Sequence, residues 1–74
     1  MSKVSLGRCL LDHHLKSRNM SQAEFARRLG IDKRRVSYYC HGERLMSPDI
    51  MYGASVLLDV PMESLYEFAF GDDQ

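Results

Sequence analysis

The sequence predicts a compact all-α domain of five short helices within 74 residues. Three observations indicate this fold class. Residues that begin and end helices recur in pairs along the chain. Between them, apolar residues return every three or four positions, as on one face of a helix. No alternating strand pattern is recognised and no linker divides the chain, so we expect no strand and one domain over residues 1–74.

The first helix is predicted over residues 6–18, after a frayed arm at residues 1–5. Leu11 and Leu15 lie one helical turn apart and therefore share a face, which we expect to be buried. Asn19 follows the helix, and asparagine tolerates the left-handed backbone conformation with which many helices end.

Two short helices are predicted between residues 21 and 41, separated by a turn at Gly30. Ser21 and Glu24 have the spacing of a capping box, which begins the first of them. Asp32 caps the second. Each helix has only about two turns, too few for stability alone in water, so the pair must pack on each other and on the rest of the chain.

Two further helices are predicted over residues 47–58 and 61–70, followed by a polar tail at residues 71–74. Ser47 is predicted to cap the first of these helices. Pro48 follows it in the first helical position, where a missing N–H has no cost. Asp59 ends this helix, where glycine would adopt the left-handed conformation more easily.

The formal net charge is zero, but the charges are distributed unevenly along the chain. Residues 1–46 hold ten Lys and Arg residues and four acids, a net charge of +6, whereas residues 47–74 hold six acids and no base, a net charge of −6. Such a chain can present one basic and one acidic face. A basic face favours a polyanionic partner.

Three consecutive cations, Lys33, Arg34 and Arg35, occupy the first turn of the helix that Asp32 caps. The helix dipole is positive at this end, so each cation there is unfavourable by roughly a few tenths of a kcal/mol. An anion in front of the helix would reverse the effect, because the N–H groups, the dipole and the cations would all attract it. Phosphates and guanine edges fit this site, although a solvated charge run remains the alternative.

The same helix is expected to bury one side and to present the other for contacts. At about 100° per residue, Val36 and Tyr39 lie on the buried side. Arg27 and Arg28, in the last turn of the preceding helix, are interpreted mainly as complements of the helix dipole. The outward and flanking positions of the later helix are those of Arg34, Arg35, Ser37, Tyr38 and His41.

The central segment resembles the helix-turn-helix of the Cro/CI-type (XRE-like) transcriptional regulator family. The matching residues include Gln22 at the start of its first helix, Ala26 at the fifth position and Gly30 at the turn, and the resemblance covers about residues 6–68. It implies a five-helix, lambda-repressor-like DNA-binding domain whose third helix enters the major groove. By position, it implies base-facing roles for Lys33, Arg34, Ser37 and Tyr38, a phosphate and base contact for Gln22, and a backbone contact for Arg44.

A subunit interface is predicted near the end of the chain. Phe68 and Phe70 lie off the apolar stripe of the helix expected over residues 61–70, and exposed apolar rings often mark an interface. We therefore assign Tyr66, Phe68 and Phe70 to a homodimer interface. The alternative is that the last helical turn unwinds and the rings cover the domain's own core.

We expect a sequence-specific DNA-binding transcriptional regulator, a small repressor of phage or prophage type that binds a palindromic operator in double-stranded DNA as a homodimer. A protein regulator is considered as a further partner. The alternative is a helix-turn-helix protein-interaction module, antirepressor or antitoxin-like, without direct DNA readout. Pairing of Arg34 and Arg35 with acids of the same chain would favour this alternative.

Other functional classes find little support. No paired carboxylates, nucleophile–base set or glycine-rich phosphate loop indicates an enzyme, so no catalytic residues are assigned. Cys9 and His13 stand one helical turn apart, but no recognised ligand spacing supports a metal site, and no cofactor is expected. Cys9 and Cys40 are interpreted as small buried apolar residues. The chain lacks a membrane-spanning apolar run and a signal peptide, which predicts a cytoplasmic protein.

Overall fold

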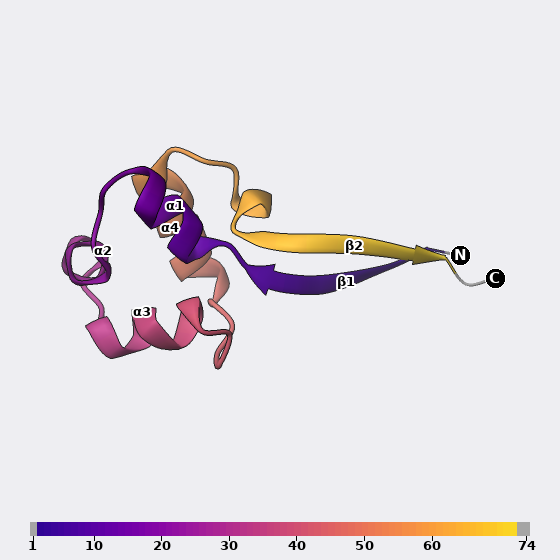
Figure 1. Ribbon diagram of the computed structural model, residues 1–74, viewed down its shortest axis with the longest axis horizontal. Helices are drawn as coiled ribbons and strands as arrows, with labels where there is room; N and C mark the ends of the chain where they lie inside the picture. Colours follow the sequence, from indigo (N-terminus) through magenta and orange to yellow (C-terminus); the bar gives the residue numbers. More distant parts are fainter. Residues whose placement is uncertain (1, 73–74) are drawn as a thin grey trace.

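The computed structural model describes residues 2–72 and consists of a helical body from which a two-stranded ribbon projects (Figure 1). Both strands project from the same side of the body (Figure 1), and Ser2 pairs with Asp72 near the tip of the ribbon. Among the described residues, none of the helices combines the length and apolarity needed to cross a membrane. The elements are β1 (Ser2–Cys9), α1 (Leu11–Ser17), α2 (Gln22–Leu29), α3 (Lys33–Cys40), α4 (Pro48–Leu58), the 3₁₀ helix η1 (Met62–Ser64) and β2 (Tyr66–Asp72).

Several predicted helix ends of the body are confirmed, although the side chain of Ser47, which precedes α4, makes no capping hydrogen bond. The Ser21 hydroxyl accepts a hydrogen bond from the backbone N–H of Glu24 at 3.0 Å, which begins α2. Gly30 ends it with a φ of 71°. Asn19 and Asp59, which follow α1 and α4, have φ values of 54° and 56° and so adopt the left-handed conformation expected of them.

The all-α prediction is wrong at both ends of the described chain. The helix expected over residues 61–70 is instead η1 followed by β2, and the helix expected over residues 6–18 begins only at Leu11. Residues 2–5 of the predicted frayed arm belong to β1, and residues 71–72 of the predicted tail belong to β2. Met1 and residues 73–74 lie outside the described residues.

Pairing between side chains of the two strands explains why these residues form a ribbon. Val4 pairs with Phe70 and Leu6 with Phe68 in an antiparallel register. Aromatic and branched residues directly opposite each other stabilise a pair of strands, and this pairing overrides the helical periodicity assumed for residues 61–70. Near the irregularity between Leu6 and Cys9, a Cβ at Gly7 would lie 3.0 Å from the Cβ of Glu67, so the close approach of the strands favours glycine here.

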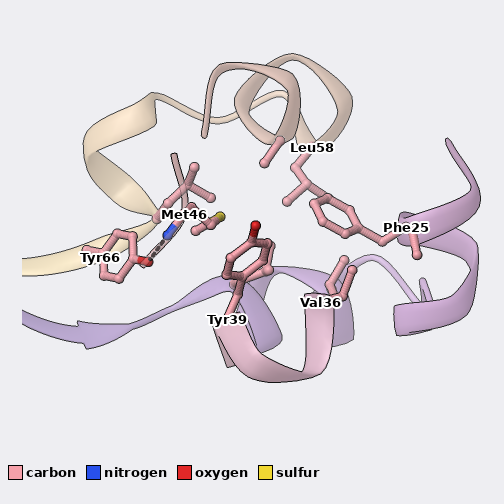
Figure 2. Packing of buried hydrophobic residues seen from close by; sticks show 11 residues of the cluster. Phe25, Val36, Tyr39, Met46, Leu58 and Tyr66 are labelled. Carbon is pink, nitrogen blue, oxygen red and sulfur yellow. Dashed lines mark hydrogen bonds between the residues drawn. The ribbon is translucent and has the colours of Figure 1, made fainter. Parts of the chain in front are cut away.

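One apolar core holds the helices together and reaches the base of the ribbon (Figure 2). Leu11 and Leu15 are both buried, as predicted for α1. The Tyr66 hydroxyl, at the start of β2, accepts a hydrogen bond from the backbone N–H of Met46 at 3.0 Å. The core residues are Leu11, Leu15, Phe25, Ala26, Val36, Tyr39, Met46, Ala54, Leu58, Leu65 and Tyr66.

Backbone contacts fix the ribbon to the body where β1 ends. The N–H of Leu10 donates to the carbonyl of Leu65 at 2.8 Å. The Nε2 atom of His14, on α1, lies 2.8 Å from the carbonyl oxygen of Ser64. His13, its neighbour, is exposed, so the two histidines do not share an environment. These bonds hold α1 against the segment that leads into β2.

Candidate nucleic-acid interface

Helix α3 buries one side and exposes a basic side, as its sequence predicts. Val36 and Tyr39 pack in the core. Lys33, Arg34 and Arg35 are exposed. The Asp32 carboxylate accepts a hydrogen bond from the backbone N–H of Arg34 at 2.9 Å and so caps the helix from which these cations project.

Helices α2 and α3 together form an open hollow of about 520 Å³ on the surface. Gln22 contributes from the first turn of α2, while Arg34 and Ser37 contribute from α3. The remaining lining residues are Asp32 and Lys33. Four of the side chains predicted to contact DNA therefore meet at one place, although Gln22 is far from the others along the chain.

The exposed cations of α3 are not neutralised within the part of the chain that the structure describes. Its ion pairs join Asp12 to Lys16, and Glu24 to Arg27 and Arg28. Lys33, Arg34, Arg35 and Arg44 belong to none of them. The intramolecular pairing that would favour a protein-interaction module is therefore not seen at Arg34 and Arg35.

Arg27 and Arg28 contrast with those cations, because Glu24 holds both. Its carboxylate lies 2.6 Å from a guanidinium nitrogen of each arginine. The hydrogen bond from Arg27, followed by that from Arg28, lowers the pKa of Glu24 below its ordinary value. The carboxylate is directed to these arginines, so the predicted capping box is present only in its first half, the bond to the Ser21 hydroxyl. The structural interpretation of Arg27 and Arg28 fits this arrangement.

Arg35 does not line the hollow and contacts Tyr39 instead. Its Nη2 atom donates a hydrogen bond to the hydroxyl of Tyr39 at 3.0 Å, and its guanidinium carbon lies 6.0 Å from the centre of that ring. Tyr39 is otherwise buried, so the bond satisfies its hydroxyl at the edge of the core. The structure thus separates Arg35 from the other predicted contact residues.

A second cluster lies at the end of α3. The guanidinium carbon of Arg44 lies 5.1 Å from the centre of the Tyr38 ring, a cation–π contact. The turn that allows it is closed by the N–H of Glu43, which donates to the carbonyl of Tyr38 at 2.9 Å, and by Gly42 with a φ of 75°. Nearby, the Ser37 hydroxyl lies 3.2 Å from Nδ1 of His41. Tyr38 and Arg44 thus form one unit beside the basic hollow.

The cysteines and histidines do not form a metal site in the described chain. No group of three His, Cys, Asp or Glu side chains there is arranged to hold a metal ion. Cys9 lies in β1, so the helical spacing considered for Cys9 and His13 does not apply. Burial raises the pKa of the Cys9 thiol, and it raises that of Cys40 to about 12. Both side chains therefore remain protonated thiols at neutral pH.

A helix-turn-helix family model matches residues 14–65, which include all of α2, α3 and α4. The chain belongs to the Cro/CI-type (XRE-like) helix-turn-helix family. This is a family of DNA-binding transcription regulators and is typically non-enzymatic. No match was found among curated proteins. Both strands of the ribbon lie outside the segment that matches the helix-turn-helix family.

The residues predicted to form a dimer interface are in different environments. Tyr66 is buried, whereas Phe68 and Phe70 are 44% and 73% exposed. Val4 and Leu6, which the sequence reasoning overlooked, are exposed beside those rings. The missed signal was alternation: large apolar residues stand at every second position of residues 4–6 and 66–70.

Proposed function

We propose that the protein is a sequence-specific DNA-binding transcription regulator that places α3 in the major groove. The hollow shared by Gln22, Lys33, Arg34 and Ser37 carries this proposal, because its cations have no ion-pair partner among the described residues. Family membership supports the same function. A phosphate or base edge at this hollow would supply the negative charge that the first turn of α3 lacks.

The side chains of the hollow suit different parts of DNA. Arg34 and Lys33 can donate to O6 and N7 of guanine. Gln22, in the first turn of α2, can bond to a base or to a phosphate. The Ser37 hydroxyl can donate or accept, so it is compatible with several bases. Specificity is therefore expected to depend most on Arg34, whose backbone N–H is also fixed by Asp32.

Tyr38 and Arg44 are proposed to hold the DNA backbone beside the hollow. Stacking on Tyr38 restricts the Arg44 side chain, so less conformational entropy is lost when the guanidinium binds a phosphate. Arg35 is proposed to contribute through charge rather than through a base, because Tyr39 holds its guanidinium. Contacts to phosphates fix the register of a protein on DNA without reading its sequence.

We further propose that the protein is a small repressor of phage or prophage type that binds a palindromic operator as a homodimer. A two-fold dimer presents two copies of α3, which read half-sites about one helical turn, ~34 Å, apart. The alternative function as a protein-interaction module would require another role for the exposed cations of α3. Binding studies with DNA distinguish the two.

The test begins with selection of a binding site from a random DNA library, using purified protein. Affinity for the selected site should fall steeply with salt, because phosphate contacts release counterions. Arg34→Ala should reduce binding to this site by about 1–3 kcal/mol and relax specificity at one base pair. Arg27→Ala is the matched control, since Glu24 already neutralises that side chain. A flat salt response, or no selected sequence, would contradict the proposal.

A further inference from the structure

We infer that two copies of this chain associate face to face through the apolar side of the β1–β2 ribbon. The inference rests on the proposed homodimer and deepens it, because it assigns the interface to both strands rather than to the rings of β2 alone. It also removes Tyr66 from the centre of the interface, since that side chain is buried and bonded to Met46.

Four large apolar side chains share this side of the ribbon. Val4 lies opposite Phe70, and Leu6 lies opposite Phe68. Residues directly opposite each other in an antiparallel pair point to the same face. Their exposed fractions are 59% and 73% for the first pair and 44% and 44% for the second. Val4 and both rings also line an open hollow of about 560 Å³, which Tyr66 and Glu63 border.

The ribbon differs from an ordinary protein surface because its apolar face extends beyond the helices that would otherwise stabilise it. A two-stranded sheet is marginally stable at best in water unless one face is covered. This ribbon extends away from the helices, and the described chain measures 45 × 23 × 20 Å. Its other side carries small or polar residues such as Ser5 and Ala69, which suit contact with water. One side therefore requires a cover and the other does not.

The side chains of this face favour a second copy as the cover. Val4 and Leu6 are the smaller residues and lie on β1, whereas the rings of Phe68 and Phe70 lie on β2. A two-fold axis along the ribbon, between two stacked copies, would place the rings of each copy over the smaller residues of the other. Large side chains then pack against small ones, as they do between the layers of a well-packed core. None of the four carries a charge, so identical faces do not repel.

The area of the face indicates a weak dimer. With ~200 Å² for a fully exposed aromatic side chain and somewhat less for Val and Leu, the four residues present roughly 400 Å² per copy. This is within the range of functional patches on monomers. Two such faces bury roughly 800 Å², less than the ~1,600 Å² of a standard stable interface. We therefore expect self-association at micromolar or higher concentration, strengthened when both copies bind one DNA.

A second exposed apolar site makes a useful comparison. Tyr52 and Val56 lie one turn apart on α4 and are 64% and 63% exposed. They are only two side chains on a helix that is otherwise supported by the core, and isolated exposed apolar residues are ordinary on protein surfaces. They nevertheless offer an alternative dimer interface, which the experiment must distinguish from the ribbon face.

Sedimentation equilibrium without DNA tests the inference on the full chain and three variants. The wild type should dimerise as its concentration rises. Phe70→Glu should raise the dissociation constant at least about tenfold, because it places a charge in the apolar face. Ala69→Glu, which adds the same charge to the other side of the same strand, should behave as the wild type. Val56→Glu should also have no effect.

A monomeric wild type up to millimolar concentration would overturn the inference, and so would dissociation by Val56→Glu but not by Phe70→Glu. If Phe70→Glu fails to fold, isotope-filtered NMR on mixed labelled and unlabelled wild type decides. Contacts between copies from the Phe68 and Phe70 rings to the methyl groups of Val4 and Leu6 are expected. A dimer that lacks these contacts would contradict the interface.

Binding to DNA separates this inference from the proposed function. Phe70→Glu should weaken binding to a palindromic site while leaving binding to a single half-site unchanged. A wild type that stays monomeric but binds half-sites in a salt-dependent manner would refute the ribbon interface and leave the DNA function intact. If Phe70→Glu disrupts the wild-type dimer but the wild type binds no DNA, the ribbon interface stands and the proposed DNA function is refuted.

Discussion

The helical body and the ribbon use their apolar residues in opposite ways. In the body, apolar side chains from four helices cover one another, and every buried side-chain polar atom of the described residues has a hydrogen-bond partner. In the ribbon, Tyr66 is buried at the base, but the other large apolar side chains remain exposed. Apart from single exposed side chains such as Tyr52 and Val56 on α4, the body is therefore complete within one chain and displays charge, whereas the ribbon is incomplete and displays an apolar face. This difference favours DNA as the partner of the body and protein as the partner of the ribbon.

Removal of one phenylalanine ring from each region should show the largest contrast. Phe25 is fully buried, so Phe25→Ala should lower the free energy of unfolding by about 3–5 kcal/mol, a large fraction of the stability of so small a domain. Phe70→Ala should cost less than about 1 kcal/mol in dilute monomer, because the ring is 73% exposed. Urea unfolding at low protein concentration measures both. Equal losses would mean that the chain itself covers the ribbon face.

The same division explains which parts of the fold the sequence predicts. Helices α2, α3 and α4 begin and end at residues such as Ser21, Gly30 and Asp59, whose effect is local and can be recognised from a few neighbours. The ribbon depends on pairing between residues 2–9 and 66–72. The alternation in each segment indicates a strand, but no local signal reveals that the two segments pair with each other. At 100° per residue Phe68 and Phe70 point in different directions, but in a strand they share a face.

The candidate site was likewise predictable only in its local features. The charge of Lys33 and Arg34 and the exposed side of α3 follow from the sequence and helical periodicity. The bond that holds Arg35 depends on where the Tyr39 hydroxyl emerges from the core. The stacking of Arg44 depends on the turn after α3. Such contacts result from tertiary packing, so their consequences for DNA binding could not be derived from spacing alone.

Tyr66 joins the two regions, and its hydroxyl offers the next test. Tyr66→Phe should lower the free energy of unfolding by about 1–3 kcal/mol, because the buried N–H of Met46 loses its acceptor. The loop before Met46 carries Arg44, so DNA affinity should also fall, equally for specific and unrelated sequences. Calorimetry and DNA titration measure these effects. Tyr52→Phe is the control, since that side chain is exposed. Unchanged stability of Tyr66→Phe would show that the two regions are not coupled through this bond.

Within the body, glycine should be more stable than aspartate at position 59. The φ of Asp59 is 56°, which is unfavourable for residues with a Cβ, and its charge lies at the negative end of the α4 dipole. Asp59→Gly should therefore raise the free energy of unfolding by about 0.5–1 kcal/mol, measured by thermal unfolding. Asp59→Asn removes the charge but keeps a side chain, so it separates the two causes. A loss of stability in Asp59→Gly would indicate an unrecognised role for the carboxylate.

The smallest effect is expected at Glu24, which neutralises Arg27 and Arg28, whereas the cations of α3 have no ion-pair partner among the described residues. Arg27 and Arg28 lower the pKa of Glu24, so their stabilising contribution is present above the ordinary pKa of 4.5 and disappears as the pH falls through the lower value in the folded state. Glu24→Gln should reduce stability slightly at neutral pH and remove this acid-dependent part, as unfolding curves across the acid range would show. It should also free two cations, so that binding to unrelated DNA tightens and its salt dependence steepens by roughly one or two phosphate contacts. Unchanged salt dependence would place Arg27 and Arg28 out of reach of DNA and leave α3 and Arg44 as the basic surface of the body.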